Sequence, residues 1–187
     1  LRSGDLVEAE SLPARGSIGK PARVITNRGN AGSPRAFSAL ALAEFSIRHQ
    51  FPDAATSESQ GLKIPPIKGR RDLRDHPLVT IDGADARDFD DAVFAEPAEN
   101  GGWRLLIAIA DVSHYVRPDS ALDQEARKRG NSVYLPDRAV PMLPEAISND
   151  LCSLRPHEDR AVMVAEIQID KNGKRLSHHI ERALIRS

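Results

Sequence analysis

The chain has 187 residues, of which 40% are hydrophobic and only 4% aromatic, and its formal net charge is -1. This length fits one domain, or one domain and part of another, at about 100–200 residues per domain. The near-neutral charge excludes a generally basic surface, so a nucleic-acid partner would need a local positive region. Cys152 is the only cysteine, which excludes a disulfide framework and favours a reducing compartment.

Neither a membrane span nor a signal peptide is visible, because no stretch approaches the roughly 18 consecutive apolar residues of a transmembrane helix. The chain begins without Met and already alternates between apolar and polar residues, and it ends at "IERALIRS" in a similar pattern. We therefore expect a fragment of a longer protein.

The first third of the chain predicts two strands and a helix. Residues 4–10 and 20–27 are short runs rich in Val and Ile, bounded by Pro and Gly. Ser33 is suited to cap a helix that begins at Pro34. Residues at helical spacing then form an apolar face that we expect to pack on a neighbouring element, namely Phe37, Leu40, Ala41 and Phe45.

Residues 53–68 are rich in Ser, Ala, Gln, Gly and Pro, and extended or irregular backbone is expected around Pro65 and Pro66. This interval is the best candidate for a domain boundary. A basic run, "KGRRDLRD", follows at residues 68–75. Such a run is most often a solvated face, and contact with phosphate groups is the second interpretation.

Beyond the boundary, strands are predicted at residues 77–82, 91–96 and 103–112, the last as a central strand covered on both faces. A helix is predicted over residues 119–131, capped by Asp119 or Ser120 and ended by Gly130.

The last part of the chain predicts a hairpin, in which residues 161–170 and 175–185 flank Asn172–Gly173, a pair typical of a type I′ turn. Short extended pieces at residues 132–136 and 139–143 precede it. Strands and helices are mixed without a regular βαβ repeat, so the predicted class is α+β.

An acidic segment joins the strands predicted at residues 77–82 and 91–96, and it contains five aspartates within ten residues. They are Asp82, Asp85, Asp88, Asp90 and Asp91. Carboxylates this close repel one another unless solvent or a cation absorbs their charge. Gly83 directly follows the first of them and the acids do not alternate, which excludes a calcium EF-hand loop.

A solvated acidic turn is the simpler alternative, but Phe89 and the flanking apolar runs suggest that part of the segment is held against the core. Several carboxylates around one hollow suit Mg²⁺, which takes oxygen ligands from one or two carboxylates, waters and substrate phosphates. Two such ions about 4 Å apart would suit phosphodiester hydrolysis. The residues alone therefore predict a metal site for phosphoryl transfer.

The segment "LVTIDGADARDFDDAV" closely resembles the signature of the ribonuclease II / ribonuclease R family of RNB exoribonucleases, more the ribonuclease R type. The resemblance continues in order through residues 102–154 and through "DRAVMVAEI", and it covers Arg71–Ser187. A looser resemblance upstream implies the end of the second cold-shock, OB-like domain. The implied organisation is the end of that β-barrel domain at residues 1–52, a linker at 53–70, and the N-terminal portion of a mixed α/β catalytic domain at 71–187.

The resemblance implies a cytoplasmic, monomeric enzyme that hydrolyses single-stranded RNA processively from its 3′ end and releases nucleoside 5′-monophosphates with Mg²⁺, or with Mn²⁺ in its place. By motif position, Asp82, Asp88 and Asp91 are implied as metal ligands, and Asp90 as the catalytic aspartate whose loss stops the chemistry. Tyr134 is implied to stack on an RNA base, whereas the residues alone favour a core strand position for it.

Asp85 has no implied role, His114 is expected to be a structural or surface residue, and Cys152 is expected to be a small buried hydrophobic residue. Because the family's catalytic domain extends further, the fragment alone is expected to be inactive. Two rival hypotheses are a catalytically silent RNA-binding module of the same family and a calcium-stabilised structural domain. Retention of all four motif acids argues against the silent module.

Overall fold

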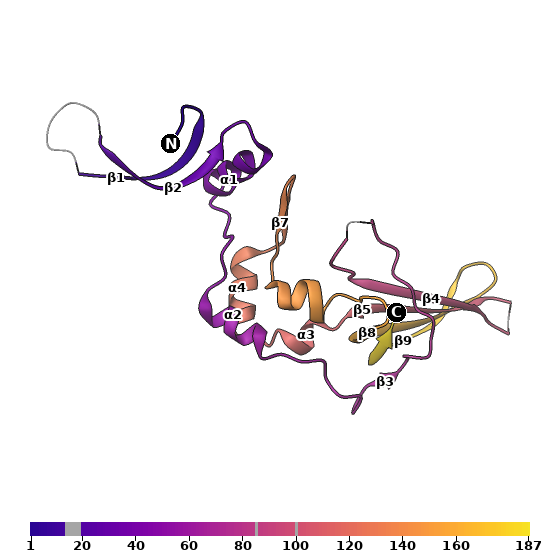
Figure 1. Ribbon diagram of the computed structural model, residues 1–187. Helices are drawn as coiled ribbons and strands as arrows, with labels where there is room; N and C mark the ends of the chain where they lie inside the picture. The colour runs from indigo at the N-terminus through magenta and orange to yellow at the C-terminus, as the bar shows by residue number, and fades with distance from the viewer. Residues whose placement is uncertain (14–19, 85, 100) are drawn as a thin grey trace. The chain divides into compact units, whose positions relative to one another are not determined.

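The computed structural model describes residues 1–13, 20–84, 86–99 and 101–187, and Figure 1 shows its elements. The chain forms two compact units. The first comprises Leu1–Gln50 together with Asn131–Met142, and the second comprises Phe51–Gly130 together with Leu143–Ser187. None of the described helices is long and apolar enough to cross a membrane.

The first unit contains an antiparallel strand pair, a helix and a small hairpin. Strand β1 (Asp5–Ser11) pairs with β2 (Ala22–Asn30), with two register irregularities. Helix α1 (Pro34–Glu44) follows, and strands β6 (Val133–Leu135) and β7 (Arg138–Val140) form the hairpin. These elements confirm the predicted strands and helix of the first third of the chain.

Helix α1 begins as predicted but buries a different face. The Ser33 hydroxyl oxygen accepts a hydrogen bond from the Ala36 N–H at 3.2 Å, which satisfies one of the free donors of the first turn. The buried side is formed by Ala36, Ser38 and Leu42. The predicted apolar face is largely open to solvent, with exposed fractions of 61% for Phe37 and 72% for Phe45, so the prediction that this face packs on a neighbour is wrong.

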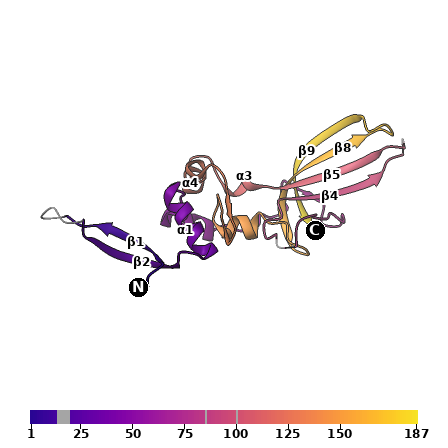
Figure 2. The same ribbon diagram turned by 90° about the horizontal axis from the view of Figure 1, so that it is seen from above.

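The second unit is a five-stranded sheet with helices at one end, and Figure 2 shows β9, β8, β5 and β4 side by side. The strand order is β3 (Arg71–Asp72), β9 (Arg175–Arg186), β8 (Asp159–Ile169), β5 (Trp103–Ala110) and β4 (Asp91–Pro97). Only β3 and β9 pair in parallel. The sheet and helices make a mixed α/β fold.

Four helical segments accompany this sheet: α2 (Asp53–Gln60), α3 (Val112–Tyr115), α4 (Ala121–Arg129) and the π-helical turn η1 (Ile147–Leu151). Helix α4 is capped by Ser120, whose oxygen accepts from the Asp123 N–H, and ends at Gly130 with φ +80°, as predicted. Helix α2, which was not predicted, occupies the first eight residues of the interval proposed as a linker.

Most of the core lies on one face of the sheet, although Ala161 and Leu184, which pair on the other face, are buried as well. Leu106 and Ala108 of β5 and Val162 and Val164 of β8 are fully buried, together with side chains from the loops and helices that include Leu73, Leu122, Ile147 and Leu154. On the other face, Trp103 and Ile109 of β5 are 46% and 48% exposed. The described residues therefore cover β5 on one face rather than on the predicted two.

Two further predictions need correction. The run at 77–82 is not a strand, because Val79 alone pairs with a strand residue, through an isolated bridge to Val93. The hairpin of β8 and β9 forms as predicted, but its turn is not type I′. Gly173 has φ +80° while Asn172 has no positive φ, and the Asp170 carboxylate accepts from the N–H groups of Asn172 and Lys174.

Candidate functional site

The acidic segment is a loop that leads into the edge strand of the sheet. Val79 and Val93 exchange both backbone hydrogen bonds, at 3.0 and 2.9 Å, and close the loop at its base. Asp91 is the first residue of β4 and pairs with Ile109 of β5. Asp82, Asp90 and Asp91 are exposed and Asp88 is half-buried. Asp85 lies outside the described residues.

The backbone of this loop is hydrogen-bonded to the rest of the second unit around Phe89. The Phe89 N–H donates to Ser153 Oγ at 3.2 Å, and its carbonyl oxygen accepts from the Leu154 N–H at 2.8 Å. The Asp90 carbonyl oxygen accepts from the Ala110 N–H at 3.0 Å. The Phe89 side chain packs against the buried core cluster. The expectation that part of the acidic segment is held against the core is thus met.

The four motif acids lie close enough to influence one another. Partial desolvation raises the pKa of Asp90, and the negative charges of Asp88, Asp91 and Asp82 raise it further. Within the described ranges, Asp82, Asp90 and Asp91 make no ion pair with a basic side chain. The loop therefore concentrates negative charge on a fixed backbone.

The donor set suits a hard divalent cation, because it consists of carboxylate oxygens whose mutual repulsion a cation would relieve. The side-chain arrangement alone does not form a complete cage: in the part of the chain that the structure describes, no three His, Cys, Asp or Glu side chains are arranged to hold a metal ion. Mg²⁺ usually takes only one or two protein carboxylates and fills its remaining positions with waters and substrate phosphates. The residues fit such an open site.

Tyr134 lies on β6 in the first unit, so it belongs to a different unit from the four acids. Its side chain is 70% exposed, which overturns the interpretation that it packs in the core. Tyr134 pairs with Ala139, and the next pair is Leu135 with Arg138. Because successive residues of a strand point to opposite faces, Tyr134 and Arg138 lie on opposite sides of the hairpin.

The three arginines of the basic run form ion pairs within the second unit, whereas Lys68 is exposed. Arg70 Nη2 donates to Asp111 Oδ2 at 2.7 Å, and the side chains are only 5% and 0% exposed. Burial alone would raise the pKa of Asp111, but hydrogen bonds from Arg70 and Ser113 outweigh it and lower the pKa. Arg182 Nε lies 3.4 Å from the same carboxylate oxygen.

The next two arginines of the run are also engaged. Arg71 pairs with Glu166 at 2.7 Å and with Glu181 at 2.9 Å. Arg74 pairs with Asp72 at 2.6 Å and with Asp159 at 3.1 Å. These two arginines connect β3 and the residues that follow it to β8 and β9, so they hold the edge of the sheet in place.

Cys152 and His114 have structural surroundings, as expected. Cys152 is buried, and desolvation raises the pKa of its thiol to about 12. The His114 and Tyr115 rings meet in a T-shaped arrangement with their centroids 5.0 Å apart, and burial lowers the pKa of the His114 imidazole.

Ser153 and Arg160 were not found by sequence reasoning, although both are completely buried and lie behind the acidic loop. Ser153 Oγ donates to the Arg87 carbonyl oxygen at 2.8 Å, in addition to accepting from Phe89. Arg160 Nε donates to the Ser153 carbonyl oxygen at 2.7 Å. The available signal was a polar residue within the apolar run "LCSL" and an arginine at the start of an apolar strand.

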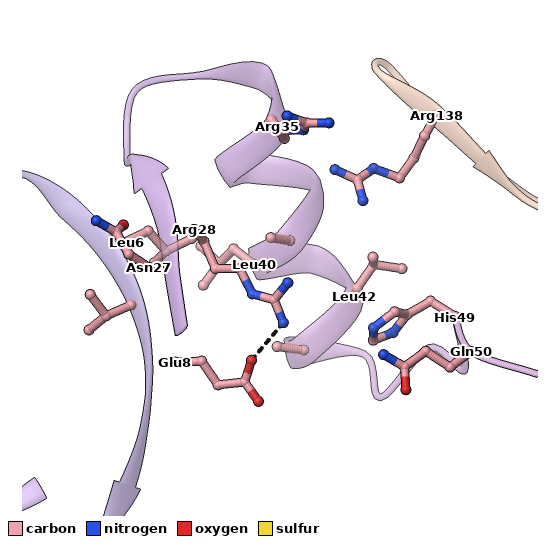
Figure 3. Close-up of a pocket in the computed structure, with 13 residues that line it drawn as sticks. Leu6, Glu8, Asn27, Arg28, Arg35, Leu40, Leu42, His49, Gln50 and Arg138 are labelled. Atoms are coloured by element: carbon pink, nitrogen blue, oxygen red, sulfur yellow. Dashed lines mark hydrogen bonds and ion pairs between the residues drawn. The ribbon is translucent and has the colours of Figure 1, made fainter. Parts of the chain in front are cut away.

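A separate pocket of about 710 Å³ lies in the first unit, and Figure 3 shows its lining. Basic side chains of β2, α1 and β7 face it, among them Arg28, Arg35 and Arg138. Arg28 is paired with Glu8 at 2.6 Å, and Arg138 is paired with Asp137 at 2.9 Å. Because two of the three guanidinium groups are already neutralised, the pocket has little excess positive charge and no group arranged for chemistry.

The fold and the acidic loop together define a class of protein. Residues 70–187 match the model of the RNB domain, which is more than half of the chain. The chain belongs to the RNB family. A curated relative, the ribonuclease R of Vibrio parahaemolyticus, is 50% identical over 178 residues. That match covers 93% of this chain but only 21% of the relative, so the chain spans about a fifth of its length.

Solved structures show the same fold. RNase R of Mycoplasma genitalium, in complex with ribose-methylated single-stranded RNA, has a TM-score of 0.81 and 34% identity, over 90% of this chain and 27% of that chain. Yeast Ssd1, described as a pseudonuclease, has a TM-score of 0.71 over 98% of this chain and 24% of that chain. At 19% identity, the second likeness concerns the fold alone.

Proposed function

We propose that this chain is part of a hydrolytic exoribonuclease that degrades single-stranded RNA processively from the 3′ end and releases nucleoside 5′-monophosphates. The observation that carries the proposal is the RNB-family match of residues 70–187, with all four motif acids in one anchored loop. Each turnover would break the bond between phosphorus and the 3′ oxygen of the preceding nucleotide, and water would supply the new oxygen on the phosphate.

The proposed organisation places the end of an OB-like cold-shock domain at residues 1–52, a linker at 53–70 and the N-terminal portion of the catalytic domain at 71–187. The antiparallel pair of β1 and β2, with its two register irregularities, is compatible with the end of a curved OB-type barrel. Helix α2 shows that the linker interval contains regular structure.

We assign Asp82, Asp88 and Asp91 as ligands of Mg²⁺, for which Mn²⁺ could substitute, and Asp90 as the catalytic aspartate. Bound there, the ion would activate water and stabilise the charge of the leaving oxygen. The raised pKa of Asp90 and its exposure are compatible with a carboxyl group that faces the reacting phosphate. Tyr134 is assigned to base stacking, which its exposure permits.

The test uses the full-length protein with RNA labelled at either end. With Mg²⁺, a 3′ label should be released at once as a mononucleotide, while a 5′ label should pass to a short final product without accumulating intermediates. Neither change should occur in EDTA. Release of a 5′ label first, or internal cleavage products, would contradict the proposed direction.

We further propose that the whole enzyme acts as a cytoplasmic monomer and that residues 1–187 alone are inactive, because the family's catalytic domain extends further. Purified residues 1–187 should therefore release no mononucleotides from labelled RNA. EDTA-sensitive release by this chain would contradict that part of the proposal.

A catalytically silent RNA-binding module is the alternative, and the fold likeness to a pseudonuclease shows that this architecture also occurs in a protein so described. The four motif acids favour the enzyme. In the labelled-RNA test, a silent module would bind RNA and leave both labels in place with or without Mg²⁺.

A further inference from the structure

One buried hydroxyl group holds the backbone on both sides of Asp88. Ser153 is 0% exposed, and its Oγ donates to the Arg87 carbonyl oxygen at 2.8 Å while it accepts from the Phe89 N–H at 3.2 Å. The Leu154 N–H adds a bond of 2.8 Å to the Phe89 carbonyl oxygen. The acidic loop is therefore fastened at the two residues that flank Asp88.

The segment that carries Ser153 is itself held by a buried cation. Arg160 is 1% exposed, and its Nε donates to the carbonyl oxygens of Ser153 at 2.7 Å and of Asp150 at 3.0 Å. Its charge is matched by Glu158 at 2.6 Å and by the Asp150 carboxylate at 3.3 Å. Arg160 lies in β8, so this support connects the acidic loop with a central strand of the sheet.

We propose that Ser153 is a positioning residue that holds the Asp88–Asp90 backbone in the arrangement required to bind a divalent cation, with Arg160 holding Ser153 in turn. This inference rests on the proposed function. The positioning role follows from two opposing effects, the repulsion between the carboxylates and the hydrogen bonds that hold the backbone. Neighbouring carboxylates repel one another, so a loose loop would relax by moving them apart. The two bonds of Ser153 resist that movement at Arg87 and Phe89, and neither bond involves a carboxylate of the site.

The proposal predicts a defect in metal binding that exceeds the loss of stability. Outer residues that orient metal ligands typically change metal affinity or activity by about 10–100-fold when they are replaced. In the full-length protein, Ser153→Ala should weaken Mn²⁺ binding by about 10–100-fold, measured without RNA by electron paramagnetic resonance. The Mg²⁺ concentration that gives half-maximal RNA hydrolysis should rise in parallel, while RNA affinity in EDTA stays the same.

The matched control is Ser59→Ala. Ser59 is also buried, at 3% exposed, and its hydroxyl donates to the Thr56 carbonyl oxygen within its own helix at 2.8 Å. It should lower the thermal midpoint without changing Mn²⁺ affinity. Ser153→Cys fills the same site with a weaker hydrogen-bonding group, so it should also weaken Mn²⁺ binding, and it replaces the alanine variant as the test if that variant does not fold.

The outcomes separate this proposal from the proposed function. If folded Ser153 variants bind Mn²⁺ as tightly as Ser59→Ala does, Ser153 is only a stabilising residue and the inference is wrong, although the enzyme assignment stands. If the unmodified protein neither binds Mn²⁺ nor degrades RNA, both proposals fail. Loss of Mn²⁺ affinity in the Ser153 variants alone supports the positioning role.

Discussion

The buried Arg70–Asp111 pair gives the sharpest prediction about stability. Asp111→Asn keeps the shape of the side chain but removes the negative charge beside a guanidinium that is 5% exposed. Arg70 Nη1 is buried and has no hydrogen-bond partner among the described residues, so the remaining charge would have little compensation. Removing one partner of a buried ion pair costs about 3–5 kcal/mol, and we expect a loss of that size.

The assay is urea unfolding of the 187-residue chain, followed by the fluorescence of its single tryptophan, Trp103. This residue lies in β5 of the same unit as the ion pair. With a slope of about 2 kcal/mol per molar urea, the expected loss moves the unfolding midpoint by about 1.5–2.5 M. A second variant, Arg70→Met combined with Asp111→Asn, should recover part of the loss because no buried charge remains.

A loss below about 1 kcal/mol for Asp111→Asn would refute this reasoning, because it would mean that the guanidinium finds water or another partner at little cost. A double variant as unstable as the sum of the two single variants would also refute it, since independent effects add.

Three other predictions concern Glu166, Gly102 and Tyr134. Arginine hydrogen bonds lower the pKa of Glu166 to about 2 from its ordinary 4.5, so Glu166→Gln should lower the free energy of unfolding by about 1–3 kcal/mol near pH 7. The difference in thermal midpoint between this variant and the unmodified chain should shrink as the pH falls from about 5 towards 2. Gly102→Ala would place its Cβ 1.9 Å from the Ile169 carbonyl oxygen, and this overpacking should lower the free energy of unfolding by about 1–3 kcal/mol. Gly61→Ala meets only an ordinary contact and should not lower it by that route. Because Tyr134 is 70% exposed, Tyr134→Ala should leave stability within about 0.5 kcal/mol but change the final RNA length in the full-length enzyme, and Tyr134→Phe should change neither.

The sequence was sufficient to predict those features that depend on a few neighbouring residues. The caps at Ser33 and Ser120 and the end of α4 at Gly130 were predictable, because each depends on a few neighbouring residues. The hairpin of β8 and β9 was predictable for the same reason, although its turn type was not. Asp170 accepts hydrogen bonds from two backbone N–H groups of the turn, and the Asn-Gly pair alone does not show this competing arrangement.

Longer-range contacts account for the failures. Helical spacing identifies apolar residues of α1 but not which side meets the rest of its unit, and Ser38 is buried there because it hydrogen-bonds Asp137, 99 residues away in the sequence. The arginines at 70, 71 and 74 read as a charged surface because their carboxylate partners lie in distant segments, apart from Asp72.

The candidate site shows the same division. The acids could be named from one segment of sequence, whereas their support could not, because Ser153 follows Arg87 by 66 positions. A serine within an apolar run gives no sign of which backbone groups it will bind. The roles of Asp82, Asp88, Asp90, Asp91 and Tyr134 remain predictions that require functional measurements.

The central claim is that the acidic loop performs metal-dependent hydrolysis of RNA, and Asp90→Asn in the full-length protein tests it most directly. The change keeps the size of the side chain and removes one negative charge. In single-turnover hydrolysis of 3′-labelled RNA with saturating Mg²⁺, the rate should fall by at least 100-fold, as expected for loss of a group that acts mainly in the transition state, while the RNA dissociation constant measured in EDTA stays within about twofold. An unchanged rate, or a loss of RNA affinity as large as the loss of rate, would contradict the account.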